Sequence, residues 1–252
     1  MVEESSPALK YWKLTVEYDG TAYVGWQRQD EGDSIQAAIE YAASQLFSEP
    51  VVAVASGRTD AGVHAENQVV SIAVHTDRIP RSVWKGMNAH LPPDIAVIQA
   101  EQMPSRFHAR FDARGKRYVY HFHDGASRSP LVRQRVWHQH QRLDCALMQA
   151  AANALVGQHD FSSFRAAGCG ATTTVRTVHR IEIVRDGDRV SMEVEGRGFL
   201  RHMVRTMAGT LVQVGLKRMP VSAVATILAQ KDRSCAGPTA PANGLTLVSV
   251  TY

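Results

Sequence analysis

The order of hydrophobic patterns along the chain constrains its fold most strongly. Residues 11–18 alternate, with Trp12 and Leu14 among the side chains on one face, which predicts a strand. Ser34 is placed to cap a helix with an apolar stripe from Ile35 to Leu46. Further segments predict strands at 51–56, 68–74 and 94–100, with a helix that begins at Pro80. This β-α-β-β-α-β order is the ferredoxin-like arrangement.

The second half of the chain repeats this order. The patterns predict a strand at 117–123, a helix at 144–157 ending at glycine, a hairpin at 177–196 around Asp186-Gly187, a helix at 198–215 and a strand at 245–252. We therefore expect an α+β protein with two ferredoxin-like (βαββαβ) halves, residues 1–105 and 106–252. Their predominantly antiparallel sheets would join across a central active-site cleft open to a large ligand.

The basic residues are clustered, although the net charge of the 252-residue chain is only +4. The segment 106–117, which overlaps the expected link between the halves at 103–113, contains one acid, Asp112, and five bases: Arg106, Arg110, Arg114, Lys116 and Arg117. A second group contains no acid: Arg197, Arg201, His202 and Arg205. Each group alone reads equally well as a solvated face. Two groups in one chain favour a polyanionic partner.

Several classes of protein are disfavoured. No apolar run approaches the ~20 residues that a membrane span needs, and MVEESSPALK does not have the pattern of a signal peptide. The three cysteines are widely spaced, without CxxC, which argues against disulfides or structural zinc and fits a cytoplasmic protein. GxGxxG, GxxxxGK[ST], GxSxG and HExxH motifs are absent.

Histidine spacings raise the question of a metal. His64-Ala65-Glu66 matches the HxE element of zinc nucleobase deaminases, but the PCxxC element that supplies their other ligands is missing. The pairs His121/His123 and His138/His140 have a spacing that metals use on strands. Eleven histidines often produce such pairs by chance, so we expect no metal.

Asp60 is the candidate for chemistry in the stretch ASGRTDAGVHAE (55–66). It follows a predicted buried strand and lies between Gly57 and Gly62, which allow a short loop to approach a ligand closely. Arg58 is near enough in sequence to favour the ionised carboxylate, which could act as nucleophile or base. Asp and Gly also favour plain turns, and on spacing alone the turn is the better interpretation.

The loop SGRTDAGVHA closely resembles the signature of the tRNA pseudouridine synthase A (TruA) family. The resemblance continues collinearly over almost the whole chain, in VEYDGTAYVGWQRQ, NAHLPPDIAV, FHARFDARGKRYVY, GQHDFSSFRA, GFLRHMVRTMAG and GLTLVSVTY. It implies an isomerase that converts uridine to pseudouridine in the anticodon stem-loop of tRNA, at expected positions 38, 39 and 40. It further implies base flipping, no cofactor and a homodimer.

The resemblance also implies roles for individual residues. Asp60 matches the catalytic aspartate, Arg58 would help to extrude the base, and Arg205 would pair with Asp60. Tyr118 matches the tyrosine that stacks on the target base, and Leu245 would line the uracil pocket. Arg201 would share a helix face with Arg205 and contact phosphate, as would three residues near the link: Arg110, Arg114 and Lys116.

A non-catalytic RNA-binding protein built from ferredoxin-like modules is the alternative. It would have the same basic groups and would not need Asp60. Arg197-Gly198-Phe199 opens like the RNP1 element of an RNA-recognition motif, but the residues that follow depart from it.

Overall fold

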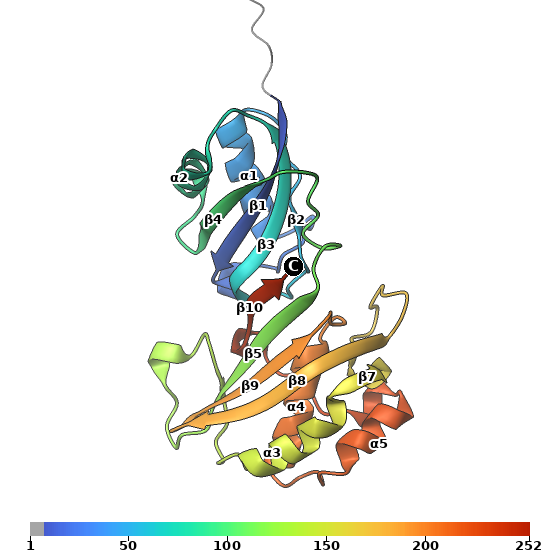
Figure 1. The fold of residues 1–252 in the computed structure, drawn as a ribbon. Coiled ribbons are helices and arrows are strands. Elements are labelled where there is room, and N and C mark those ends of the chain that lie inside the picture. The colour runs from blue at the N-terminus through green and yellow to red at the C-terminus, as the bar shows by residue number, and fades with distance from the viewer. Residues whose placement is uncertain (1–7) are drawn as a thin grey trace, which may run out of the picture. The chain divides into compact units, whose positions relative to one another are not determined.

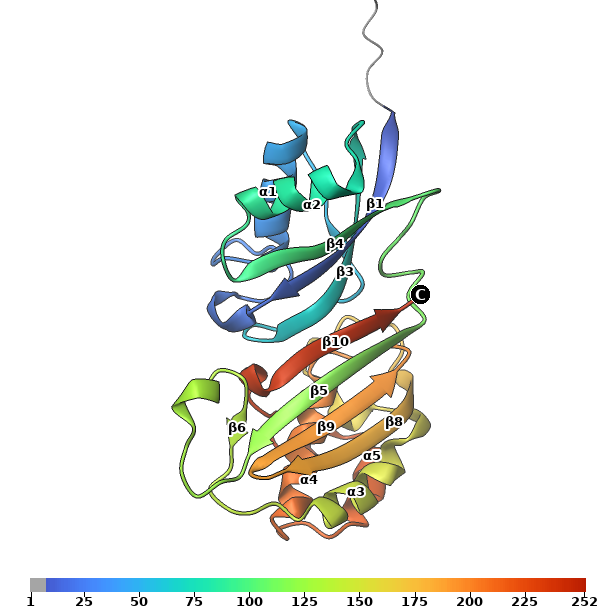
Figure 2. The same ribbon diagram turned by 60° about the vertical axis from the view of Figure 1, so that its left-hand side comes forward.

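The computed structural model describes residues 8–252 of the protein (Figures 1 and 2). Residues 1–7 lie outside the described residues. They form most of MVEESSPALK, the N-terminal stretch whose pattern is not that of a signal peptide. The chain divides into two compact units, one running to Ala113 and including Tyr252, the other comprising Arg114–Thr251. The segment 106–113 therefore belongs to the first unit, whereas the predicted boundary lies at 105/106.

The first unit has the predicted ferredoxin-like order. Its elements are β1 (Leu9–Tyr18), α1 (Ile35–Phe47), β2 (Val54–Ala55), β3 (His64–His75), α2 (Pro80–His90) and β4 (Ile95–Met103). The strands pair antiparallel in the order β4-β1-β3-β2. Both helices lie on one face of this sheet (Figures 1 and 2), where Trp12, Leu14 and Val16 of β1 are completely buried.

Local signals explain where these elements begin and end. Ser34 caps α1 as predicted, since its Oγ accepts a hydrogen bond from the Ala37 N–H. The strand predicted at 51–56 is wrong in extent, because β2 covers only Val54 and Ala55. Ser56 adds one backbone hydrogen bond to β3, from its N–H to the Val69 carbonyl at 2.8 Å, whereas 51–53 do not pair with it. The backbone of Ala53 bonds instead to α1 side chains: its N–H donates to Glu40 Oε1 at 3.0 Å, and its carbonyl accepts from Gln36 Nε2 at 3.2 Å.

The second unit repeats the arrangement with additions. Its elements are β5 (Gly115–His123), β6 (Trp137–His138), α3 (Cys145–Ala152), β7 (Gly157–Asp160), β8 (Val175–Asp186), β9 (Arg189–Gly196), α4 (Met203–Gly215), α5 (Ala223–Gln230) and β10 (Leu245–Thr251). The path β10-β5-β9-β8 has the ferredoxin-like strand order, and β7 extends it antiparallel beside β8. Helices α3, α4 and α5 lie on one face (Figure 1). The α+β fold with mostly antiparallel pairing is confirmed.

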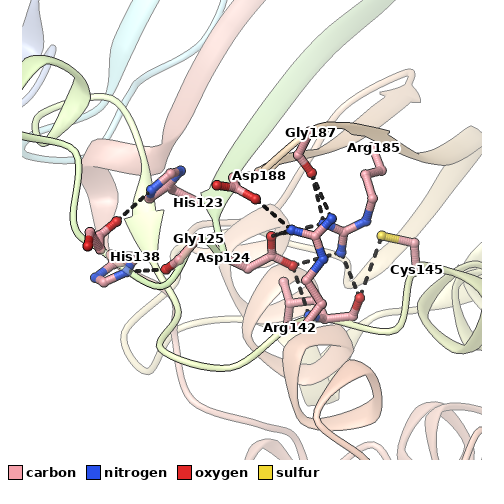
Figure 3. A network of polar contacts seen from close by, with 11 residues as sticks. His123, Asp124, Gly125, His138, Arg142, Cys145, Arg185, Gly187 and Asp188 are labelled. Atoms are coloured by element: carbon pink, nitrogen blue, oxygen red, sulfur yellow. Dashed lines mark hydrogen bonds and ion pairs between the residues drawn. The ribbon is translucent and has the colours of Figure 1, made fainter.

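A polar network anchors the end of β5 to the β8–β9 hairpin (Figure 3). The Asp124 carboxylate is fully buried and accepts hydrogen bonds from Arg185 Nη2 at 2.7 Å and from the Leu143 N–H at 2.9 Å. Burial raises the pKa of the Asp124 carboxyl, but the hydrogen bonds from Arg185 and Leu143 outweigh burial and lower it overall. Arg142 joins the network through Asp124 Oδ1 and Asp188 Oδ1. This part of the second unit is therefore held by a paired, hydrogen-bonded charge.

Candidate functional site

Asp60 lies in the loop between β2 and β3, and the backbone of an earlier segment holds this loop. Asp60 forms a single antiparallel bridge with Gly25. Beside it, the Trp26 N–H donates to the Thr59 carbonyl at 3.0 Å, and the Gly62 N–H donates to the Tyr23 carbonyl at 3.3 Å. Hydrogen bonds on both the N-terminal and the C-terminal side of Asp60 thus fix the backbone that carries its carboxylate. Asp60 itself is half-buried.

Two glycines make this arrangement possible. Gly25 has φ +111° and Gly62 has φ +77°, in the region that side chains disfavour. A Cβ on Gly25 would lie 2.7 Å from the Thr59 carbonyl oxygen and 3.1 Å from the Asp60 carbonyl carbon. Gly62 was singled out in the sequence. Gly25 was not, because its partner lies 35 residues away and no local pattern reports it.

A buried polar cluster supports the loop from below. The Thr59 Oγ1 lies 2.9 Å from the Tyr18 hydroxyl, and Gln68 Nε2 donates to the Gly57 carbonyl at 2.9 Å. Ser56 Oγ completes the cluster by donating to Gln68 Oε1 at 2.6 Å. Burial raises the pKa of Tyr18 to about 12, so its hydroxyl stays protonated at neutral pH. In the sequence, Tyr18 and Gln68 read only as members of strands, so their support of the loop was not predicted.

The histidine and the glutamate of the loop do not form a metal pair. His64 is completely buried, whereas Glu66 is exposed. His64 Nδ1 lies 3.1 Å from both the Gly20 N–H nitrogen and Asp19 Oδ1. Among residues 8–252, no group of three or more His, Cys, Asp and Glu side chains is arranged to hold a metal ion.

Tyr118, Arg205 and Leu245 belong to the second unit. Tyr118 is a β5 residue, 8% exposed, whose ring meets Phe199 edge to face at 5.3 Å. Arg205 lies in the first turn of α4, where its Nε donates to the Ala240 carbonyl at 2.8 Å. Leu245 begins β10 opposite Tyr120 and is 6% exposed. Three different elements of the second unit thus carry these side chains: the Tyr118 ring is on β5, the Arg205 guanidinium on α4 and the apolar Leu245 on β10.

Arg201 is not on a helix, and the prediction that it shares a helix face with Arg205 is wrong. Helix α4 begins at Met203, and His202 before it takes a left-handed conformation with φ +63°. The Arg201 carbonyl accepts a hydrogen bond from the Ala166 N–H at 3.0 Å, so this turn is tied to the loop after β7. Arg201 is exposed at the turn and remains a candidate for phosphate contact.

The other basic candidates are distributed over both units. Arg58 and Arg110 are exposed in the first unit; in the second, Arg114 is exposed and Lys116 half-buried on β5. These long cationic side chains suit contacts to phosphate oxygens.

Comparison with known proteins places the chain in a class. The family model described as tRNA pseudouridine synthase matches residues 14–112 and 151–252, which include both the Asp60 loop and the α4 and β10 segments. The chain therefore belongs to the tRNA pseudouridine synthase family.

Individual relatives are similar over nearly their full length. The chain is 50% identical to tRNA pseudouridine synthase A of Geobacter sulfurreducens over 242 residues, covering 95% of this chain and 98% of the relative. It is 45% identical to the protein of the same name from Geotalea daltonii, with the same coverage. The relative of that name from Gluconobacter oxydans is 44% identical over 97% of this chain and 90% of its own length.

Proposed function

We propose that this protein converts uridine to pseudouridine in the anticodon stem-loop of tRNA, at positions 38, 39 and 40. The observation that carries the proposal is the family match across both units, with Asp60 held on a fixed, glycine-framed loop. The family match and the named relatives, in addition to the basic clusters, support an isomerase that acts on tRNA.

The reaction rearranges the substrate without adding or removing groups. The N1–C1′ bond of uridine breaks, the uracil turns, and C5 bonds to C1′. The C5 proton leaves to a base, and N1 gains a proton, so atoms and electrons balance without a redox partner. The reacting atoms are not accessible inside a stacked helix, and the target base therefore has to flip out.

Asp60 takes the central role in the proposal. Its carboxylate attacks the nucleotide or removes a proton from the sugar, and either role needs an oxygen held in one place. The bridge to Gly25 and the buried cluster under Thr59 supply that rigidity. Arg58, exposed two residues earlier, assists extrusion of the base.

Residues of the second unit bind the base and complete the chemistry. Tyr118 stacks on uracil, and its hydroxyl serves proton transfer at C5. Leu245 supplies apolar surface for the ring, and Arg205 pairs with the Asp60 carboxylate. Phosphate contacts come from Arg201, Arg114 and Lys116 of the second unit and from Arg110 of the first. We further propose a cytoplasmic homodimer that needs no cofactor; no helix within the described residues is long and apolar enough to cross a membrane.

A direct experiment tests the activity. The purified protein is incubated with unmodified tRNA transcripts without any cofactor, and pseudouridine is mapped by carbodiimide treatment and primer extension. We expect new stops one nucleotide 3′ of each uridine at positions 38 to 40. If the protein binds the transcripts but produces no stop anywhere, the non-catalytic alternative replaces it.

A further inference from the structure

Phe111 is a large aromatic residue placed at the surface of the first unit. It lies in the segment that follows β4, and 74% of it is exposed. The other six phenylalanines of the chain are buried or half-buried. A phenylalanine ring exposed to water forgoes the free energy of burial, so a rigid backbone that keeps it exposed points to a use for the ring.

The backbone around Phe111 is rigid because His108 organises it. His108 Nδ1 accepts hydrogen bonds from the N–H groups of Arg110 and Phe111, both at 3.2 Å. The turn closes at its ends, where the His108 N–H donates to Asp112 Oδ2 at 2.8 Å and the Asp112 N–H donates to the His108 carbonyl at 3.1 Å. The His108 ring packs against the Phe111 ring, with centroids 4.2 Å apart.

The turn is also anchored to the body of the first unit. Ala109 is completely buried; its N–H donates to Ser71 Oγ on β3 at 3.2 Å, and its carbonyl accepts from the Tyr252 hydroxyl at 2.7 Å. Phe107 packs on Tyr252 with centroids 5.0 Å apart. The buried residues hold the turn, and Phe111 is held outward from it.

The surroundings of Phe111 are basic. The Arg110 guanidinium lies 5.8 Å from the centre of the Phe111 ring, and Arg106 is exposed in the same segment. An exposed ring flanked by cations is the combination that binds unpaired nucleobases, because the ring stacks on a base while the cations neutralise its phosphates. The exposed cations of this segment, Arg106 and Arg110, match the negative charge of RNA.

We propose that Phe111 and His108 form a stacking platform for an unpaired nucleobase of the substrate RNA, distinct from the uridine that reacts. Arg110 and Arg106 hold the phosphates beside that base. The inference rests on the proposed function, since it takes tRNA as the ligand. The platform contributes affinity and register and takes no part in bond breaking.

The first test compares tRNA dissociation constants of the wild type, Phe111→Ala and Phe111→Trp by equilibrium filter binding. Loss of one stacked base weakens binding roughly 5- to 150-fold, and Phe111→Trp restores it because an indole also stacks. The rate at saturating tRNA stays near wild type in both variants. Tyr41→Ala removes another exposed aromatic of the first unit, on α1 and 61% exposed, and is the matched control, with unchanged affinity.

The second test identifies the partner of the ring. Anticodon stem-loops with a single abasic nucleotide at each unpaired position are titrated against the wild type and Phe111→Ala. One abasic position should weaken wild-type binding and leave Phe111→Ala unaffected, which couples that base to the ring. Equal losses in both proteins at every position overturn the proposal.

Other outcomes also overturn it. If Phe111→Ala binds tRNA as the wild type does, or if its loss of affinity follows a lower oligomeric mass in light scattering, Phe111 contacts protein or nothing. The proposed function is judged separately, because pseudouridine formation by the wild type does not depend on these results.

Discussion

Replacing Gly25 with alanine is expected to slow pseudouridine formation by moving Asp60. The new Cβ would lie 2.7 Å from the Thr59 carbonyl oxygen, whereas an ordinary contact is about 3.4 Å or more, so the loop must shift by ~0.7 Å. A misplacement of about 1 Å in a catalytic group costs on the order of 100-fold in rate. We therefore expect the single-turnover rate to fall roughly 10- to 100-fold.

Two effects have to be separated in this variant. Alanine at φ +111° is strained by about 1–3 kcal/mol whatever its contacts, and such strain lowers the melting temperature without displacing Asp60. Gly168→Ala is the matched control, because Gly168 has φ +70° and no atom within 4 Å of a Cβ. It should show the strain alone and keep its activity.

The assay follows tritium released from C5 of labelled uridine in tRNA, at saturating enzyme and at a temperature where both variants are folded. tRNA affinity is measured in parallel. If Gly25→Ala reacts at the wild-type rate, or if Gly168→Ala is slowed as much, the contact between Gly25 and the loop does not control the position of Asp60.

Further predictions concern stability, proton transfer and salt. Asp124→Asn should lower the free energy of unfolding by about 3 kcal/mol, the low end for a broken buried ion pair because Arg142 is partly exposed. Because folding lowers the pKa of Asp124, its ionised carboxylate stabilises the protein fully above the unfolded-state pKa, and this stabilisation is lost as pH falls through the folded-state pKa. In urea titrations, the free energy of unfolding should therefore fall less on acidification in Asp124→Asn than in wild type. Tyr118→Phe should keep tRNA affinity and slow single turnover about 100-fold or more, and a near-normal rate would show that the hydroxyl is dispensable. If about four basic side chains contact phosphate, affinity should fall roughly 100-fold between about 50 and 200 mM salt; a flat response would contradict phosphate binding.

The sequence predicts the parts of the fold that depend on local pattern. The alternation in β1, the Ser34 cap and the turn at Gly187 each act over a few neighbouring residues, and each is confirmed. The α+β class follows from their order. Failures occur where distant groups compete for the backbone: α1 side chains bond to Ala53 and shorten β2.

The same limit applies to the candidate site. Asp60 was found because glycines and a signature loop surround it in sequence. Its supports were not, since Gly25, Tyr18 and Gln68 reach the loop only through the folded sheet. Apolar periodicity placed Arg201 on a helix, but His202 turns left-handed and delays the start of α4. The exposure of Phe111 could not be predicted either, because the sequence does not show whether a single phenylalanine is buried or exposed.

The central claim is that the Asp60 carboxylate performs the isomerisation. Asp60→Asn keeps the size and shape of the side chain and removes its charge and its nucleophilic oxygen. Wild type and variant are compared for single-turnover pseudouridine formation and for tRNA affinity. For Asp60→Asn we expect a rate at least about 1,000-fold lower with tRNA binding within a few-fold of wild type. Turnover by Asp60→Asn at the wild-type rate would contradict the central claim.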